Sequence, residues 1–412
     1  MTVSRAGSTR SFLPYARQLI DTSDIRAVTG VLRSGHLTTG PAVRRFESGF
    51  KTAVGAKHAV AVSSGTAALH TALLAAGIGA GDEVITTPYT FVATASTILH
   101  SGARPVFVDV VPGGFNLDPS GIPARLTKRT KSIVAVHFAG EPCDLDALTR
   151  ISGRHGLILI EDAAHALGAA YQGRKIGSIG DLTAFSFHPA KHITTAEGGM
   201  VTTNSSELAD RMRRIRNHGL SLDVHEREAR QTWMYDVMTP GYNYRLSDIQ
   251  SALGTSQLRK LSRFLRRRRS IARAYQKLIG DMEELVLPSD PAGRSVRHGW
   301  HLYVVRVKEG AVRGGRDAVY KELIASGIGV NVHYRPVHLF SCYRRLLGTR
   351  PGDFPNAERS FREALTLPLF PAMTAGDVQR VATALRNAVG RLLIRKVSRR
   401  VRGGGAFSAG RV

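Results

Sequence analysis

The stretch Phe185-Ser186-Phe187-His188-Pro189-Ala190-Lys191-His192-Ile193-Thr194-Thr195-Ala196-Glu197-Gly198-Gly199-Met200 places one lysine in a short loop. The loop joins two apolar runs, Leu182 to Phe187 and Met200 to Thr203, that have the composition of buried strands. A lysine forms a Schiff base only when its amine is partly deprotonated and its reach is fixed, and a loop between two strands fixes the reach. Lys191 is therefore the candidate catalytic residue, although a lysine beside a Gly-Gly pair is commonly a solvated loop residue.

A second element with the same logic lies upstream. Leu157-Ile158-Leu159-Ile160-Glu161-Asp162 is predicted to be a buried strand that ends in carboxylates, and Asp162 precedes Lys191 by 29 residues. A lysine and an acid at strand ends are the pair that a pyridoxal 5'-phosphate (PLP) enzyme needs. The lysine holds the aldehyde, and the acid keeps the pyridine nitrogen protonated so that the ring accepts electrons.

A third element predicts an anion site. Ala61-Val62-Ser63-Ser64-Gly65-Thr66-Ala67-Ala68-Leu69-His70 has the pattern of a strand, a glycine turn and the start of a helix. This arrangement points backbone N–H groups and a hydroxyl at an anion, and the helix dipole assists. We expect Gly65, Thr66 and Ala67 to hold the cofactor phosphate, with Ser186 adding a hydroxyl. Each signal is weak alone, but the three in this order indicate a PLP site.

Strands and helices alternate through the first half of the chain, which favours a mostly parallel sheet covered by helices on both faces. Helical patterns at Ala67–Ala76 and Leu145–His155 separate some of the candidate strands. Those strands are Ala59–Val62, Glu83–Thr87, Pro105–Val110, Ser132–Phe138, Leu157–Glu161, Thr183–Phe187 and Gly199–Thr203. In such sheets ligands bind at the carboxyl ends of strands, where Asp162 and Lys191 both fall.

On these motifs the sequence resembles the DegT/DnrJ/EryC1/StrS family of sugar-nucleotide aminotransferases, from about Pro14 to about Leu385. Four further segments resemble one branch of that family, the C4 aminotransferase of pseudaminic acid biosynthesis. These segments are Leu13–Gln18, Leu37–Pro41, His137–Asp144 and Gly327–His338. The resemblance implies an α/β, fold-type I PLP-dependent aminotransferase, with a mixed, mostly parallel sheet between helices and a smaller C-terminal α/β domain.

The resemblance and the order of the expected elements also indicate the limits of the domains. We expect a large PLP-binding domain with an N-terminal arm over residues 1–250, and a small domain that includes the linking helix over residues 251–395. Residues 396–412 form a basic tail with almost no large apolar side chains. Such a segment buries too little surface to offset its ordering entropy. We expect it to be disordered and dispensable for catalysis.

The resemblance also implies roles for individual residues. Phe91 aligns with an aromatic side chain that stacks on the cofactor ring, the alternative being a core position. His165 aligns with a residue beside the cofactor hydroxyl, and Asn243 with an asparagine that reaches the phosphate bound by a neighbouring subunit. The residues that we expect to contact the sugar substrate are Tyr15, His188, Arg245, His333 and Tyr334. Ala196 stands where many relatives have glycine, which we interpret as a small-for-small change of little consequence.

Composition sets limits on the rest. The 412 residues are 43% hydrophobic, contain two cysteines and carry a formal net charge of +25. The cysteine count suits a reducing cytoplasm, and no apolar run is long enough for a membrane span or a signal peptide. Arg266 to Arg269 are interpreted as the solvated face of a long helix from Ser247 to about Ile279, because no nucleic-acid motif accompanies them. No nucleic-acid or membrane partner and no metal are expected.

The expected reaction moves an amino group from L-glutamate to C4 of a UDP-linked 4-keto-6-deoxy-N-acetylhexosamine, in a homodimer with shared active sites. A perosamine or 4-amino-arabinose type substrate is the alternative within the family. Two other classes stay open, a dehydratase of the same fold and a regulatory protein that binds PLP without catalysis. Lys191 argues against the dehydratase, because those relatives have histidine in place of the lysine.

Overall fold

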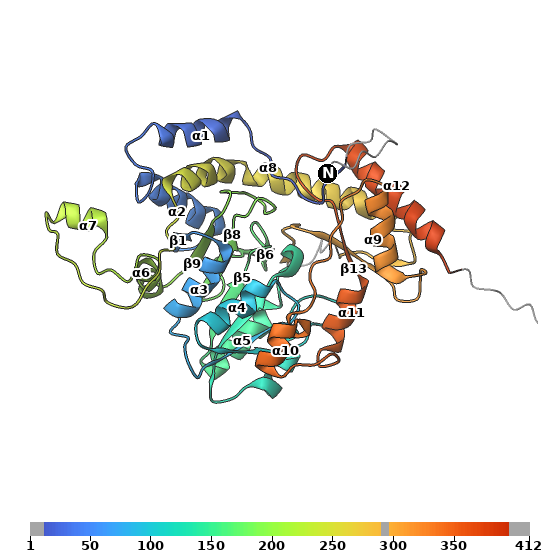
Figure 1. Cartoon of the computed structure of the whole chain (residues 1–412), viewed down its shortest axis with the longest axis horizontal. Coiled ribbons are helices and arrows are strands. Elements are labelled where there is room, and N and C mark those ends of the chain that lie inside the picture. Colours follow the sequence, from blue (N-terminus) through green and yellow to red (C-terminus); the bar gives the residue numbers. More distant parts are fainter. Residues whose placement is uncertain (1–11, 290–295, 395–412) are drawn as a thin grey trace, which may run out of the picture.

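The computed structural model describes residues 12–289 and 296–394, and it centres on a seven-stranded sheet with the order β1-β9-β8-β5-β4-β2-β3 (Figure 1). Only β9 runs opposite to the other six strands, because it pairs antiparallel with both β1 and β8. The strands are β1 (His58–Val62), β2 (Glu83–Thr86), β3 (Arg104–Phe107), β4 (Thr130–Val136), β5 (Ile158–Asp162), β8 (Leu182–Ser186) and β9 (Gly199–Thr203). The predicted mixed, mostly parallel sheet is confirmed.

Successive side chains along the central strands build two apolar cores, one on each face of the sheet. On β5, Leu159 packs into one core and Ile160 into the other, and Ile133 and Val134 on β4 divide in the same way. Helices α2 (Pro41–Val54) and α5 (Leu145–His155) cover the first face. Helices α3 (Gly65–Ala75), α4 (Val92–His100) and α6 (Ser206–Ile215) cover the second.

Helix α8 (Asp248–Ile279) is the longest element of the described chain and spans the molecule from α1 (Thr22–Leu32) to α12 (Ala375–Leu392) (Figure 1). It begins at a capping box in which Ser247 and Gln250 bond each other's backbone N–H groups. Its buried residues recur at helical spacing, as Phe264, Arg268, Ile271, Tyr275 and others show.

The interpretation of Arg266 to Arg269 as a solvated face is therefore wrong at one position. Arg268 falls on the buried stripe of α8 and is only 1% exposed. Its guanidinium donates to the carbonyl oxygens of Trp300, His301 and Leu369. Three carbonyl acceptors compensate part of the cost of burying this charge.

A smaller sheet, which is antiparallel, consists of β10 (Leu285–Val286), β12 (Tyr303–Val307) and β13 (Ala364–Leu367). It packs with α9 (Gly315–Ala325), α12 and the C-terminal half of α8 around a further core. Because α8 also contributes Leu261 and Phe264 to a core of the large sheet, the domain boundary at residue 250 stays a prediction. The smaller elements are α7 (Val224–Ala229), α10 (Ser341–Leu347), α11 (Pro355–Glu363) and the short strands β6 (Ala170–Tyr171), β7 (Arg174–Lys175) and β11 (Val296–Arg297).

Two structural features are relevant to possible membrane and metal partners. Within residues 12–289 and 296–394, no helix has the length and apolar character to cross a membrane, and no group of three potential metal-ligating side chains is present. The predicted basic tail, residues 396–412, lies outside the described residues.

Candidate active site

The carboxyl ends of β4, β5 and β8 open into one pocket of about 560 Å³, between the large sheet and the segment after α9. All but three of the residues predicted for the site line this pocket. They are Tyr15, Gly65, Thr66, Phe91, Asp162, His165, Ser186, His188, Lys191, His333 and Tyr334. Residues distant in sequence by more than 300 positions therefore meet at the sheet edge where ligands of such folds bind.

Lys191 lies in the turn that follows β8. Its backbone N–H donates to the His188 carbonyl at 2.8 Å, which closes the turn and fixes the direction of the side chain. Removal from water lowers the pKa of Lys191 to about 8, although the Asp162 carboxylate opposes the shift. A substantial fraction of this amine is therefore uncharged near neutral pH, as an attack on an aldehyde requires.

Asp162 is the last residue of β5 and is 6% exposed. Its Oδ2 accepts the hydroxyl of Thr94 at 2.8 Å, and its Oδ1 accepts the N–H of Ala164 at 3.2 Å. Burial raises the pKa of Asp162, against these hydrogen bonds and the charge of Lys191. A buried carboxylate in this position favours a cationic or N–H donor partner, and a protonated pyridine nitrogen in the pocket would supply one.

The predicted anion turn begins α3. Ser64 is the N-cap residue, and its Oγ accepts the N–H of Ala67 at 3.0 Å. The N–H of Ala67 is thus bonded within the turn, and Ala67 does not line the pocket. Gly65 and Thr66 do line it. A Cβ at Gly65 would lie 2.7 Å from the Cβ of Ser186, so glycine is needed for the close approach of α3 to β8.

The opposite wall of the pocket is aromatic. The Nδ1 of His165 accepts the N–H of Ala139 at 3.3 Å, and its Nε2 lies 3.2 Å from the hydroxyl of Tyr334. Burial lowers the pKa of His165 well below its ordinary value, so Nε2 carries the proton of a neutral ring. Phe91 is 53% exposed, with its ring 5.6 Å from that of Tyr334, so the alternative of a core position for Phe91 is wrong.

The remaining predicted sugar contacts form the mouth of the pocket. His333 is buried, with Nδ1 2.8 Å from the hydroxyl of Thr366, and burial lowers its pKa to about 3. The ring of Tyr15 lies 5.6 Å from the ring of His333. His188 is exposed and accepts the N–H of Ala190 at 3.3 Å through Nδ1.

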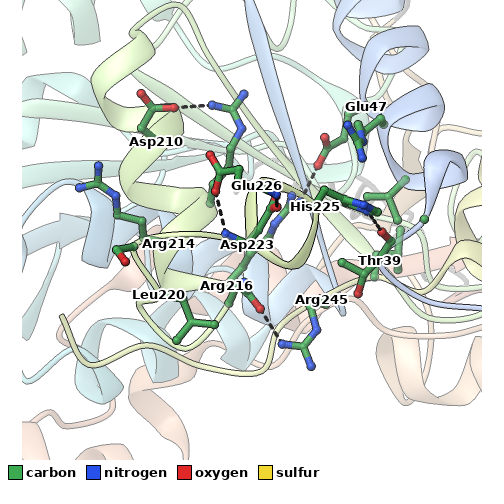
Figure 2. Close-up of a pocket in the computed structure, with 17 residues that line it drawn as sticks. Thr39, Glu47, Asp210, Arg214, Arg216, Leu220, Asp223, His225, Glu226 and Arg245 are labelled. Atoms are coloured by element: carbon green, nitrogen blue, oxygen red, sulfur yellow. Dashed lines mark hydrogen bonds and ion pairs between the residues drawn. The ribbon is translucent and has the colours of Figure 1, made fainter. Parts of the chain in front are cut away.

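Asn243 and Arg245 do not reach the Lys191 pocket. Asn243 is exposed and pairs with Asn217 as an isolated antiparallel bridge. Arg245 donates to Oδ1 of Asn217 at 2.8 Å and lines a separate, polar pocket of about 530 Å³ between α2, α6 and α7 (Figure 2). Figure 2 shows the guanidinium of Arg245 at the rim of that second pocket, on the side away from Glu47.

Sequence reasoning missed two residues that contact this constellation. Thr94 donates its hydroxyl to the Asp162 carboxylate and orients it. The hydroxyl of Thr94 also lies 2.7 Å from that of Thr90. The only sequence signal was the four-residue spacing of these two threonines, which would place them on one face of a helix. His301 lines the pocket with its ring 4.3 Å from the ring of His165. Nδ1 of His301 is buried without a hydrogen-bond partner among the described residues, and no local pattern distinguishes this histidine from a core residue.

The loop residue Ala196 also requires a correction. It has a φ of +67°, in the left-handed region that glycine adopts readily and alanine does not. The interpretation of Ala196 as a change of little consequence is therefore wrong. The position matters through its left-handed backbone, which glycine adopts without strain, and not through the reach of its side chain.

Comparison with known proteins adds the family. The model of the DegT/DnrJ/EryC1/StrS aminotransferase family matches residues 18–386. The spore coat polysaccharide biosynthesis protein SpsC of Bacillus subtilis is 46% identical over 92% of this chain and 97% of its own length.

Two solved structures are similar over nearly their whole length. The PMP form of Streptococcus pneumoniae Spr1654, described as a sugar aminotransferase, has a TM-score of 0.88 at 32% identity and covers 92% of this chain and 100% of its own. Helicobacter pylori PseC, an aminotransferase involved in the biosynthesis of pseudaminic acid, has a TM-score of 0.86 at 32% identity and covers 93% and 100%.

Proposed function

We propose a specific reaction for this chain, which belongs to the DegT/DnrJ/EryC1/StrS aminotransferase family and is a PLP-dependent sugar aminotransferase. The expectations for family, fold-type I architecture, enzyme class and cofactor are confirmed. We infer that the enzyme moves the amino group of L-glutamate to C4 of a UDP-linked 4-keto-6-deoxy-N-acetylhexosamine. The observation that carries this proposal is the convergence of Lys191, Asp162 and the N-terminus of α3 on one pocket.

The pocket fits PLP. Lys191 would hold the aldehyde carbon, Asp162 the ring nitrogen, and the N–H groups of Gly65 and Thr66 with the Ser186 hydroxyl the phosphate. The hydrogen bond from Ala139 directs the Nε2–H of His165 toward Tyr334, at the side of the pocket where the cofactor hydroxyl is expected. When bound, PLP supplies an electron sink for negative charge that develops at the carbon bearing the amine.

Lys191, Asp162 and Phe91 have different roles in the proposed reaction. Lys191 Nζ, once an incoming amine has released it, would act as the base that takes the proton from Cα of glutamate and as the acid that returns it. The pKa of about 8 suits a group that must accept and release a proton near neutrality. Asp162 keeps the opposite end of the ring cationic. Phe91, exposed in the pocket, offers a flat apolar face for stacking.

We also propose a homodimer with shared active sites. Residues 216–245, the hairpin arm, leave the large sheet and return through antiparallel bridges, and α7 lies at their far end in Figure 1. The arm exposes 82% of Trp233 and 63% of Met234, and Tyr235, Val237 and Met238 beside them are also exposed. Large apolar side chains exposed together are typical of an interaction surface. A second copy of the chain would cover it and bring Asn243 and Arg245 to the partner's cofactor and substrate.

The sugar is the least constrained part of the proposal. The likeness to PseC over its whole length supports a pseudaminic acid type substrate. The higher identity to a spore coat polysaccharide biosynthesis protein equally supports a product that enters a cell-surface polysaccharide. We further propose a cytoplasmic location, because both cysteines are free, as a reducing compartment requires.

The test is a panel of UDP-, dTDP- and GDP-linked 4-keto sugars, each incubated with the PLP-loaded enzyme and L-glutamate and followed by mass spectrometry. The expected result is amination of the UDP-linked 4-keto-6-deoxy-N-acetylhexosamine in preference to the others. Preferential amination of a dTDP- or GDP-linked sugar would replace the substrate and keep the enzyme class. PLP bound without any loss of its absorbance band on addition of glutamate would favour a regulatory protein.

A further inference from the structure

The strand that presents Asp162 carries a second carboxylate that the mechanism does not use. Glu161 directly precedes Asp162 on β5 and is fully buried, with a relative exposure of 0%. It does not line the Lys191 pocket. A completely buried carboxylate is costly unless it is fully hydrogen-bonded, so its presence one residue from the site requires an explanation.

Glu161 points to the opposite face of the sheet from Asp162, because successive side chains on a strand alternate. Glu161 shares its face with Leu159, whereas Asp162 shares its face with Ile160, and these two residues belong to different cores. Thr183 is the cross-strand partner of Glu161 and lies on the same face. His137 follows Ala135 by two residues and Thr183 precedes Phe185 by two, and both Ala135 and Phe185 belong to the first core. A small polar cluster is thus embedded in the apolar layer beneath the pocket.

Every hydrogen bond to Glu161 comes from a different segment. Its Oε2 lies 2.8 Å from Nε2 of His137, the residue after β4. Its Oε1 accepts the N–H of Gly180 at 2.7 Å and the hydroxyl of Thr183, on β8, at 2.9 Å. The carboxylate therefore joins β4, β5 and β8, the three strands whose ends supply Val136, Asp162 and Ser186 to the pocket.

The protonation of His137 follows from its second hydrogen bond. Its Nδ1 accepts the backbone N–H of Cys143 at 3.0 Å and so carries no proton, and the ring proton on Nε2 is donated to Glu161. Burial acts to lower the pKa of His137, but its contacts with Cys143 and Glu161 raise that pKa to about 10. A second ring proton would have to sit on Nδ1 and displace the bond from Cys143, so the geometry at Nδ1 favours the neutral ring. Burial alone would raise the pKa of Glu161, but the hydrogen bonds from His137, Gly180 and Thr183 hold it below its ordinary value. The carboxylate is therefore ionised and all of its neighbours are donors.

His137 also connects this cluster to the cofactor side of the sheet. Its backbone N–H donates to the carbonyl of Asp162 at 3.1 Å. The loop that it begins contains Ala139, whose N–H orients the ring of His165. Movement of His137 would therefore displace Asp162 through the main chain and His165 through the loop.

We propose that Glu161 and His137 form a positioning pair for the cofactor site, which ties the ends of β4, β5 and β8 together and sets where the carboxylate of Asp162 and the ring of His165 lie. This inference rests on the proposed roles of Asp162 and His165. Neither Glu161 nor His137 touches the cofactor, so each acts through another residue.

Glu161→Gln is the discriminating substitution because it preserves the shape of the side chain and replaces one acceptor oxygen with an NH₂ donor. The glutamine oxygen can still accept from Gly180 and Thr183, but its NH₂ group then faces the Nε2–H of His137. Moving the imidazole proton to Nδ1 only transfers the conflict to the N–H of Cys143. No tautomer satisfies the network. In the double variant His137→Gln/Glu161→Gln, the side chain at 137 can turn its oxygen toward the new amide, which restores the hydrogen bond between residues 137 and 161 and leaves the N–H of Cys143 without its acceptor.

The experiment compares wild type, Glu161→Gln, His137→Gln and the double variant, with Thr202→Val as the control. Thr202, on β9, pairs with Thr183 of β8 and donates its hydroxyl to the carbonyl of Gly177 at 2.8 Å. Its loss therefore removes a buried hydrogen bond next to the cluster but none of the hydrogen bonds to Glu161. The measurements are kcat for amination, KM for the sugar nucleotide, the dissociation constant of PLP from the apo-protein, and the pH midpoint at which the absorbance of the cofactor bound to Lys191 changes.

For Glu161→Gln we expect kcat to fall roughly 10- to 100-fold, as for other residues that orient a functional ligand. The KM for the sugar should stay within about twofold, PLP should bind more weakly, and the absorbance midpoint should move. The double variant should be more active than the two single effects multiplied together would allow. Thr202→Val should lower the thermal midpoint and leave the absorbance midpoint unchanged.

Three results would overturn the pairing. They are an unchanged kcat and absorbance midpoint in Glu161→Gln, the same changes in Thr202→Val, or single effects that simply multiply in the double variant. If Glu161→Gln does not fold, a folded and active double variant supports the pairing and an unfolded one contradicts it. A wild-type protein that binds PLP but does not react with glutamate would instead contradict the proposed function.

Discussion

The Lys191 pocket and the hairpin arm differ in how completely one chain satisfies their side chains. In the pocket, Asp162 accepts two hydrogen bonds and His165 is bonded through both of its nitrogens. On the arm, Trp233 is 82% exposed and Val237 54%. The contrast indicates that the groups of the pocket are positioned within one chain, whereas the exposed apolar side chains of the arm would be covered only in the proposed homodimer.

The sharpest test of the pocket is Lys191→Ala. We expect turnover to be abolished while the protein folds and still binds PLP without a covalent link, because Lys191 is the only lysine among the described residues that line the pocket. Rates and the absorbance band of the covalently bound cofactor are the measurements. Lys277→Ala, an exposed lysine on α8, is the control and should behave as wild type. Appreciable turnover by Lys191→Ala would remove this lysine from its catalytic role.

Asp162→Asn should reduce kcat by several orders of magnitude, since the ring nitrogen would lose the anion that keeps it protonated. The apo-protein should become more stable. Burial raises the pKa of Asp162 above 3.8, so the folded state resists its ionisation and loses stability as pH rises through that raised value. The variant lacks this penalty.

The difference in thermal midpoint between Asp162→Asn and wild-type apo-protein should therefore be largest near neutral pH and disappear at about pH 3.8 and below. Thermal unfolding of both apo-proteins across that range is the measurement. An equal midpoint at every pH would show that the carboxylate is not strained by burial, and an unchanged kcat would mean that another acid protonates the ring.

The arm is tested by Asn243→Ala, which we expect to weaken PLP binding by roughly tenfold, about the effect of one hydrogen bond to a charged group. Mixing Asn243→Ala with Lys191→Ala should restore partial activity, because a mixed dimer would hold one intact site. Asn387→Ala, on the exposed face of α12, is the control. No recovery, under conditions in which subunits demonstrably exchange, would place the whole site within one chain and end the contrast drawn above.

The smallest effect is expected within the lysine loop itself. Ala196→Gly should stabilise the protein by about 0–1.6 kcal/mol. It removes the left-handed strain of ~1–2 kcal/mol for an L-residue and adds unfolded-state entropy worth ~0.4–1 kcal/mol. Ala190→Gly, in the same loop without a positive φ, should instead destabilise. Equal losses in both variants, measured by denaturant unfolding, would show that the strain at Ala196 is relieved elsewhere.

The sequence alone was enough to identify the family, the strand ends and the two principal residues. Lys191 and Asp162 are recognisable because each follows an apolar run, and parallel strands bring their carboxyl ends together whatever the rest of the fold does. The elements themselves follow from periodicity, so the seven strands of the central sheet were predicted with ends displaced by only a few residues.

Tertiary structure decided what the carboxylate beside Asp162 contacts and which arginine is buried. Glu161 faces away from the pocket, and only the packing on that face of β5 shows that it is bonded to His137. Arg268 is one of four consecutive arginines, and its burial depends on carbonyl groups from residues more than 30 positions away. Burial and pairing are set by surfaces that meet only after folding, and local sequence does not encode them.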